Sequence, residues 1–450
     1  MTTHTDQFVD RLHETAQASY SRETVQQVHN CLLDYLGATI VGSSMLGDKG
    51  ARFLTHLGGG AEDAALIGLG RRSTLERAAY VNGLSSHVAE MDDGVRFGMM
   101  HPGAPIFSAL LPVAEYEKVS GDAFVRGVVT GYEAAIRLST ALQPSHYARG
   151  FHTTGTCGVV GAAAGIAAML GFDRRQMKDA ISTAIVSAHG TLKVLEDKSD
   201  LKPSNVARAA HAGLIAAYMG RAGFSGPDDA LAGKAGMCAM MADSCNTVPL
   251  IADAEEPFAI HKVYFKPYAA CRHAHPSIEA ALQLRAEHRV DLQAVEAITV
   301  TTYESVMGKH DHASVSTVAS AKMSIPHSLA IALVLGRAGV GEFTPETVDN
   351  PEICELAHKV SIHPDADLSA LVPDVRAAIV SVRLLSGSEY STRVDYPKGE
   401  PENPMTPAEL QDKFMSLCSY AGESDEKARR IAQAALHAEA DLHALFALLT

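Results

Sequence analysis

The sequence predicts a mainly α-helical protein with a large all-helical domain and a smaller α+β domain. Apolar residues recur at helical spacing almost continuously from Asp6 to about Phe258. After about Tyr264, β-branched residues alternate with polar ones, which is typical of strands. Aromatic residues make up only 6% of the chain and Trp is absent. This composition favours closely packed helices over a β-sandwich or barrel.

The first part of the chain divides into helices whose ends carry recognisable signals. Gly171 follows one predicted helix and Asp173 opens the next, as expected of a helix stop and an N-cap. Residues 158–168 are rich in Ala and Gly, which lets helix backbones approach closely. The helices expected here cover residues 75–89, 103–118, 121–142, 156–170, 174–188 and 203–221.

The second part combines short strands with two helices. Residues 378–385 and 389–396 flank Ser386-Gly387-Ser388, a good hairpin signal. Further strands are expected at 295–303 and 360–363, and helices at 276–288 and 324–336.

A proline-rich linker precedes the last helices. Residues 397–404 hold three prolines and a glycine, and Thr406-Pro-Ala-Glu409 is a capping box that restarts the helical pattern. We therefore expect a helical domain over residues 1–263, a small α+β domain over 264–399, and C-terminal helices over 400–450 that pack back on the helical domain.

Composition and charge exclude several classes of function. The formal charge is −14 and no basic run is present, so neither nucleic acid nor an anionic membrane is an expected partner. The amino terminus lacks a signal-peptide pattern, which predicts a cytoplasmic protein. Seven scattered cysteines without a CxxC pair are typical of reduced thiols.

Three basic or imidazole side chains stand directly before predicted helix starts. They are His101, His152 and Lys202. A helix start offers unpaired N–H groups and the positive end of the helix dipole, so it suits a carboxylate. A fourth group of cations lies in residues 265–275, at the predicted junction between domains, where ligand clefts commonly form.

Acidic and histidine-rich segments suggest two other kinds of site. Asp92 and Asp93 could orient a histidine or accept a proton, but taken alone they are better explained as a solvated helix end capped by Gly94. The His-x-His pairs at 273–275 and 310–312 lack a third ligand at a diagnostic spacing, so no metal site is predicted. Nucleotide-binding loops and a GxSxG elbow are absent from the sequence.

Taken together, these motifs resemble the MmgE/PrpD family in order and spacing over nearly the whole chain. The motifs are His87…Glu90-Met-Asp92-Asp93 followed by His101-Pro-Gly-Ala, Gly150-Phe-His-Thr-Thr-Gly155, Lys202-Pro with Ala209-Ala210, and Phe265-Lys-Pro-Tyr with Cys271-Arg272 and His275. The resemblance implies a helical domain, a smaller α+β domain, a homodimer, and an active site between domains that needs neither metal nor organic cofactor.

The family includes 2-methylcitrate dehydratase, cis-aconitate decarboxylase and iminodisuccinate epimerase. All three make or break a bond at a carbon next to a carboxylate, so they need an acid, a base and cations in one pocket. The resemblance assigns catalytic roles to Lys202, His152, His101, Tyr147 and Asp93. It assigns substrate binding to Lys266, Arg272, His275, Asp92, Glu90, Arg96 and His327.

The residues leave the reaction open. We expect a cofactor-independent hydro-lyase of the 2-methylcitrate dehydratase type, with Lys202 as the base if burial and cationic neighbours lower its pKa. The alternatives are an epimerase that uses Tyr147 as a second acid or base, a decarboxylase, and a non-catalytic protein that binds polycarboxylates. Departures from the family pattern at Glu90, Gly94, Cys271 and His327 weigh most against the decarboxylase.

Overall fold

The computed structural model describes residues 2–195, 199–253 and 256–450. These residues form two compact units. Unit 1 holds the described residues up to Tyr264 together with Thr406–Thr450, and unit 2 is Phe265–Met405. Unit 1 is mainly helical and unit 2 is α+β, which confirms the predicted fold class.

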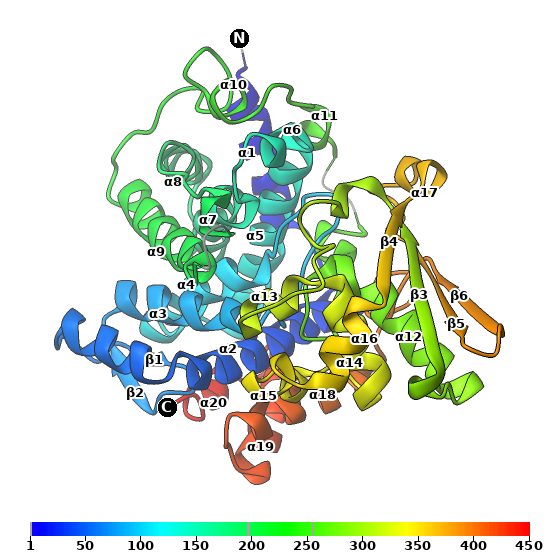
Figure 1. The fold of residues 1–450 in the computed structure, drawn as a ribbon. Coiled ribbons are helices and arrows are strands. Elements are labelled where there is room, and N and C mark those ends of the chain that lie inside the picture. Colours follow the sequence, from blue (N-terminus) through cyan, green and yellow to red (C-terminus); the bar gives the residue numbers. More distant parts are fainter. Residues whose placement is uncertain (1, 196–198, 254–255) are drawn as a thin grey trace. The chain divides into compact units, whose positions relative to one another are not determined.

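Unit 1 consists of helices and one small hairpin (Figure 1). The helices before Tyr264 are α1 (His4–Gln17), α2 (Arg22–Leu57), α3 (Leu75–Val88), α4 (Gly103–Tyr116), α5 (Gly121–Leu142), α6 (Ser145–Ala148), α7 (Thr153–Met169), α8 (Arg174–Val186), α9 (Lys202–Arg221), α10 (Met237–Met241) and α11 (Val248–Ile251). The C-terminal ones are α18 (Pro407–Tyr420), α19 (Asp425–Ala435) and α20 (Leu442–Phe446).

Helix α7 lies at the centre of unit 1, and every one of its residues is buried. It packs against α5, α9, α4 and α8. A Cβ atom added at Gly161 would stand 2.8 Å from the carbonyl oxygen of Gly131 on α5, closer than real Cβ contacts. The Ala- and Gly-rich sequence is therefore what allows α5 and α7 to pack backbone to backbone.

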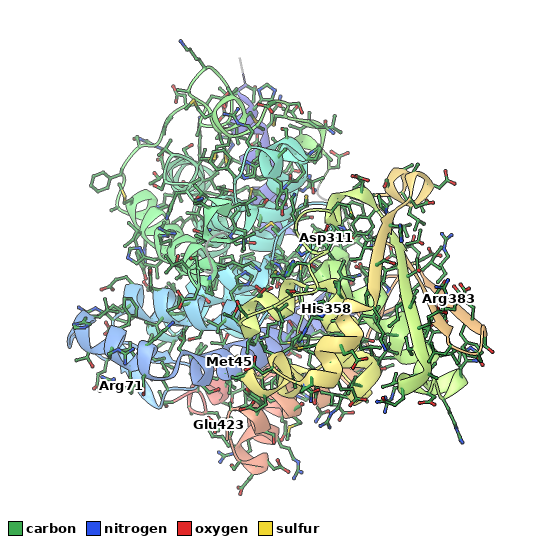
Figure 2. All side chains as sticks on the ribbon, viewed as in Figure 1. Met45, Arg71, Asp311, His358, Arg383 and Glu423 are labelled. Carbon is green, nitrogen blue, oxygen red and sulfur yellow. The ribbon has the colours of Figure 1, made fainter. Side chains whose placement is uncertain are left out.

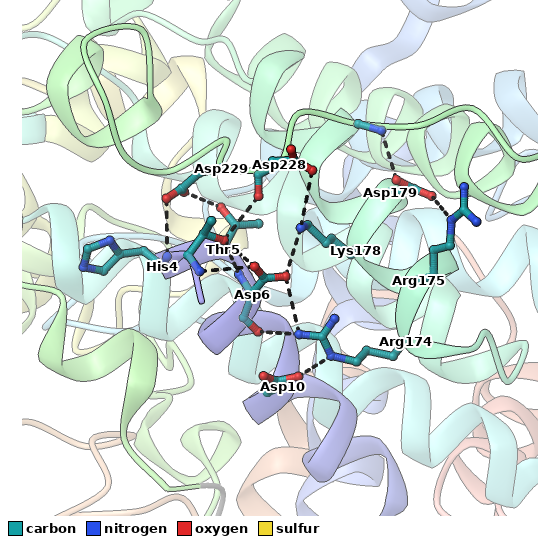
Figure 3. A network of polar contacts seen from close by, with 12 residues as sticks. His4, Thr5, Asp6, Asp10, Arg174, Arg175, Lys178, Asp179, Asp228 and Asp229 are labelled. Atoms are coloured by element: carbon teal, nitrogen blue, oxygen red, sulfur yellow. Dashed lines mark hydrogen bonds and ion pairs between the residues drawn. The ribbon is translucent and has the colours of Figure 1, made fainter. Parts of the chain in front are cut away.

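A polar network joins α1 to α8 (Figure 3). Lys178 on α8 lies 2.9 Å from the Asp6 carboxylate, and Arg174 pairs with Asp10. Hydrogen bonds from Lys178 and Thr3 hold the pKa of Asp6 well below its usual range. These pairs fix the first helix of the chain beside α8, from which it is remote in sequence.

The C-terminal segment completes the core of unit 1. Helix α18 begins with the predicted capping box, in which Thr406 accepts a hydrogen bond from the N–H of Glu409, and it packs on α2. Between these two helices, Lys413 Nζ lies 2.5 Å from Asp34 Oδ1 and 2.7 Å from the carbonyl oxygen of Met91. Both charged side chains are almost fully buried.

Unit 2 is built on a four-stranded sheet in the order β4-β3-β5-β6 (Figure 1). Its strands are β3 (Val295–Thr302), β4 (Val360–Pro364), β5 (Ala378–Leu384) and β6 (Glu389–Val394); β3 and β4 run parallel and the other pairs antiparallel. Helix α12 (His275–His288) packs against β5 and β6. The remaining helices are α13 (Val318–Met323), α14 (Ile325–Leu335), α15 (Pro345–Val348), α16 (Pro351–His358) and α17 (Ala366–Ala370).

Two features of unit 1 go beyond the sequence analysis. A hairpin of three-residue strands, β1 (Ala64–Leu66) and β2 (Arg71–Ser73), joins α2 to α3. Helix α2 runs for 36 residues but bends at Gly47, whose positive φ of 47° suits glycine.

Among the helices that the structure describes, none is long and apolar enough to cross a membrane.

Candidate active site

Three helix starts in unit 1 carry the side chains singled out in the sequence. His101 lies two residues before α4, His152 is the N-cap residue of α7, and Lys202 is the first residue of α9. These helices pack on one another, and α3 packs on α4 and α9. The cations therefore share one region of unit 1, near the C-terminal end of α3.

His87, at the end of α3, links the other histidines. Its ring centroid is 4.9 Å from that of His101 and 5.9 Å from that of His152. Its Nδ1 lies 2.7 Å from Asp92 Oδ2, and both side chains are at most 1% exposed. Asp92 Oδ2 is also 3.6 Å from His101 Nδ1. One buried carboxylate thus faces two imidazoles, so the alternative of a solvated helix end capped by Gly94 is wrong.

Asp93 positions His101 and the start of α4. Its Oδ1 accepts the N–H of Gly103 at 3.0 Å, and its Oδ2 accepts the Tyr132 hydroxyl at 2.7 Å. Its backbone carbonyl lies 2.6 Å from His101 Nδ1. Burial, followed by the negative charge of Asp34, raises the pKa of Asp93 to about 8. The carboxyl group is therefore mostly uncharged at neutral pH.

His152 is a buried, neutral imidazole. Burial and the neighbouring His87, Lys202 and His101 keep its pKa well below the ordinary value, while Glu90 opposes them. The amide Nδ2 of Asn205 lies 3.2 Å from His152 Nδ1.

Lys202 forms an ion pair with Glu90, a residue whose positive φ of 59° is unusual outside glycine.

Two further residues of the predicted site lie nearby in the chain. Tyr147 is half-buried on α6; its backbone N–H donates to Gln143 Oε1, and Gln143 Nε2 donates to Thr153 beside His152. Arg96 is buried, with its guanidinium 4.8 Å from the centre of the Phe97 ring.

The other four predicted residues belong to unit 2. Lys266 is fully buried, and Arg272 forms an ion pair with Glu400. His275 begins α12, with Nε2 3.1 Å from the carbonyl oxygen of Ala270. His327 on α14 is fully buried, and burial lowers its pKa to about 4.

Two groups of side chains are close enough to hold a metal ion. In unit 2, Cys271 and His273 meet His310. However, burial, then His310, and then Arg376, Arg272 and Lys309 keep the pKa of His273 well below its usual value. The same three positive side chains would repel a metal ion there. The second group is His87, Asp92 and His101. The hydrogen bond between His87 and Asp92 already accounts for the short distance between these two side chains.

A surface cavity of about 420 Å³ lies elsewhere in unit 1, between the end of α2 and β2. Its arginines include Arg72, which pairs with Glu115, and Arg77, which donates to the carbonyls of Gly58 and Gly59. Arg71, labelled in Figure 2, is exposed and also lines this cavity. Since two of these arginines hold protein groups, the helix starts are the better candidate site for a carboxylate.

Sequence reasoning assigned no role to His87 or Asn205. His87 appeared only as part of a motif, and Asn205 is a single amide in a helix, without any signal in its neighbours. The role of each residue depends on contacts with side chains that are distant in sequence.

Comparison with known proteins agrees with this architecture. The MmgE/PrpD N-terminal domain matches residues 6–247, and the MmgE/PrpD C-terminal domain matches residues 268–438. The chain belongs to the MmgE/PrpD family, which confirms the resemblance found in the sequence.

Relatives in this family are enzymes. The chain is 26% identical to a cis-aconitate decarboxylase-like protein of Aspergillus oryzae, over 95% of this chain and 93% of that protein. It is 24% identical to the cis-aconitate decarboxylase of Homo sapiens, over 92% of this chain and 88% of that protein.

Proposed function

We propose that this protein is an enzyme that removes a proton from the carbon next to a carboxylate in a small di- or tricarboxylate. We place it first as a hydro-lyase of the 2-methylcitrate dehydratase type. The observation that carries the proposal is that His101, His152 and Lys202 stand at three helix starts in one region of unit 1. There, His87 lies beside both histidines, and the buried Asp92 faces His101. Helix starts and cations both stabilise carboxylates and the charge of an enolate.

The contacts support different roles for His101 and Lys202. The carbonyl of Asp93 accepts a hydrogen bond from His101 Nδ1, so neutral His101 keeps a lone pair on Nε2 and suits the base. Lys202, which begins α9 and pairs with Glu90, suits binding of a substrate carboxylate. This assignment moves the base from Lys202, where the sequence analysis put it, to His101.

A second candidate is decarboxylation. The relative from Homo sapiens is named cis-aconitate decarboxylase, and the one from Aspergillus oryzae is named a cis-aconitate decarboxylase-like protein. Loss of carbon dioxide leaves an electron pair on the same carbon, so the same cations would stabilise it. An epimerase would need a second acid or base on the opposite face, for which Tyr147 remains the candidate.

The proposal has further parts that rest on family membership. In it the protein is a cytoplasmic homodimer and works without a metal or organic cofactor. Its substrate-binding residues are Lys266, Arg272, His275, His327, Arg96, Asp92 and Glu90.

Replacing Lys202 tests whether the site is catalytic. We expect Lys202→Ala to lower kcat/KM by at least about 10²-fold, the usual cost of losing one fixed charge-stabilising group. The circular dichroism spectrum and unfolding midpoint should stay close to the wild-type values. Lys49→Ala, which removes an exposed lysine paired with Asp200, is the matched control and should leave turnover unchanged.

A non-catalytic binder would behave differently. It would show no turnover in the wild type, and Lys202→Ala would weaken polycarboxylate binding only as much as the loss of one contact requires.

A further inference from the structure

A buried hydrogen bond determines which nitrogen of His152 carries its proton. Asn205 Nδ2 lies 3.2 Å from His152 Nδ1, and the two side chains are 1% and 6% exposed. An amide nitrogen donates and does not accept, so His152 Nδ1 must be the acceptor.

The other contacts of Asn205 fix the orientation of its amide. Its Nδ2 is also 3.2 Å from the carbonyl oxygen of Thr191, and its Oδ1 lies 2.7 Å from a guanidinium nitrogen of Arg208. A carbonyl only accepts and a guanidinium only donates. A flipped amide would therefore set oxygen against oxygen and nitrogen against nitrogen, so Nδ2 faces His152.

A neutral imidazole carries one proton. The low pKa of His152, caused by burial and by His87, Lys202 and His101, keeps the ring neutral at neutral pH. Because Nδ1 accepts the bond from Asn205, the proton sits on Nε2.

We propose that Asn205 is a positioning residue that holds His152 as the Nε2–H tautomer, so that His152 offers the substrate a hydrogen-bond donor instead of a base. That a substrate binds beside His152 rests on the proposed function. In that function His152 donates to a carboxylate or enolate oxygen, while proton abstraction is left to another group.

His146 provides an internal reference of opposite tautomer. Its Nδ1 lies 2.9 Å from the carbonyl oxygen of Met241, and its Nε2 lies 2.7 Å from the Thr156 hydroxyl. Since the carbonyl can only accept, His146 carries its proton on Nδ1. His146 is also buried in unit 1, and burial likewise lowers its pKa.

The test is a long-range ¹H–¹⁵N correlation spectrum of the full chain with ¹⁵N-labelled histidine, recorded at pH 8 without substrate. Loss of signals in His152→Gln and His146→Gln assigns the two rings. We expect the Nε2–H pattern for His152 and the Nδ1–H pattern for His146. A wild-type His152 with its proton on Nδ1, or with both nitrogens protonated, would overturn the proposal.

The Asn205→Asp variant provides a reversal. A carboxylate only accepts, so His152 should become protonated on Nδ1 while His146 keeps its pattern. If the variant folds and His152 still shows the Nε2–H pattern, Asn205 does not set the tautomer. Should the variant fail to fold, the wild-type spectrum alone still decides the tautomer.

Turnover gives an independent readout. We expect Asn205→Asp to lower kcat by about 10²-fold or more, with a smaller change in KM, because a misplaced proton removes the donor. Asn30→Asp on α2, where Asn30 is hydrogen-bonded to Gln26 and Gln27, makes the same charge change and is the control. A chain that turns over no substrate but shows the stated tautomers would refute the proposed function and leave the role of Asn205 intact.

Discussion

At the scale of single residues, Asp93 links protonation to stability. Its folded pKa of about 8 lies above the ordinary value for aspartate of roughly 3.9, so the folded protein binds this proton more tightly than the unfolded chain. Between these two values the unfolded state binds fewer protons. The contribution of Asp93 to stability is therefore present at low pH and is lost as pH rises toward 8.

Replacing the carboxyl group of Asp93 by an amide tests the direction of this pH dependence of stability. Relative to Asp93→Asn, the wild type should lose up to about 1.4 kcal/mol of unfolding free energy per pH unit between roughly pH 5 and 7. Urea unfolding at several pH values measures the difference. Asp412→Asn, at an exposed site on α18, is the control. Parallel curves for the wild type and Asp93→Asn would show that the carboxyl group is charged in the folded state.

Some features of single residues in the site could be predicted from the sequence, and others could not. The sequence could place three site residues at helix starts, namely His101, His152 and Lys202. Helix-start signals such as Pro102 and Pro203 lie next to these residues in the chain. The hydrogen bond from Asn205 to His152 joins residues 53 positions apart, and only the packing of α7 on α9 creates it. Similarly, the pKa of Asp93 depends first on burial and then on Asp34, which lies on α2 and is remote in sequence.

At the scale of elements, the attachment of α18 to α2 depends on a buried ion pair. Lys413→Met removes the ammonium group that contacts Asp34 Oδ1 and leaves the buried carboxylate in place. We expect a loss of about 3–5 kcal/mol in unfolding free energy, as usual when one partner of a buried pair is removed.

The control for this variant is Lys427→Met on α19. Lys427 forms a partly exposed pair with Glu423 one helical turn away, so its loss should cost no more than about 0.5 kcal/mol. Equal effects of the two substitutions on the denaturant midpoint would contradict the importance of the buried pair.

Elements with strong local signals could be predicted, and those without could not. The expected helix over 121–142 has the same bounds as α5, and the capping box at Thr406 opens α18. The strands around Gly387 form the β5–β6 hairpin, with Gly387 at a φ of 85°. The three-residue strands β1 and β2 are too short to show alternation, and the bend of α2 at Gly47 interrupts a pattern that otherwise continues.

At the scale of the whole molecule, the helical unit brings histidines and a lysine together beside buried carboxylates. The fold class follows from periodicity and composition because both act over long stretches. The reaction does not, since dehydration, decarboxylation and epimerisation all require the same charge at the same carbon. Only chemistry on a defined substrate separates them.

The most direct test is proton NMR of the enzyme in D₂O with 2-methylcitrate, citrate, cis-aconitate and iminodisuccinate. The account predicts deuterium at a carbon next to a carboxylate, or a new vinyl or diastereomeric signal, with at least one acid. It also predicts that Lys202→Ala suppresses the signal and Lys49→Ala does not. Unchanged spectra for every acid, or equal rates in the wild type and Lys202→Ala, would contradict proton abstraction at the helix starts.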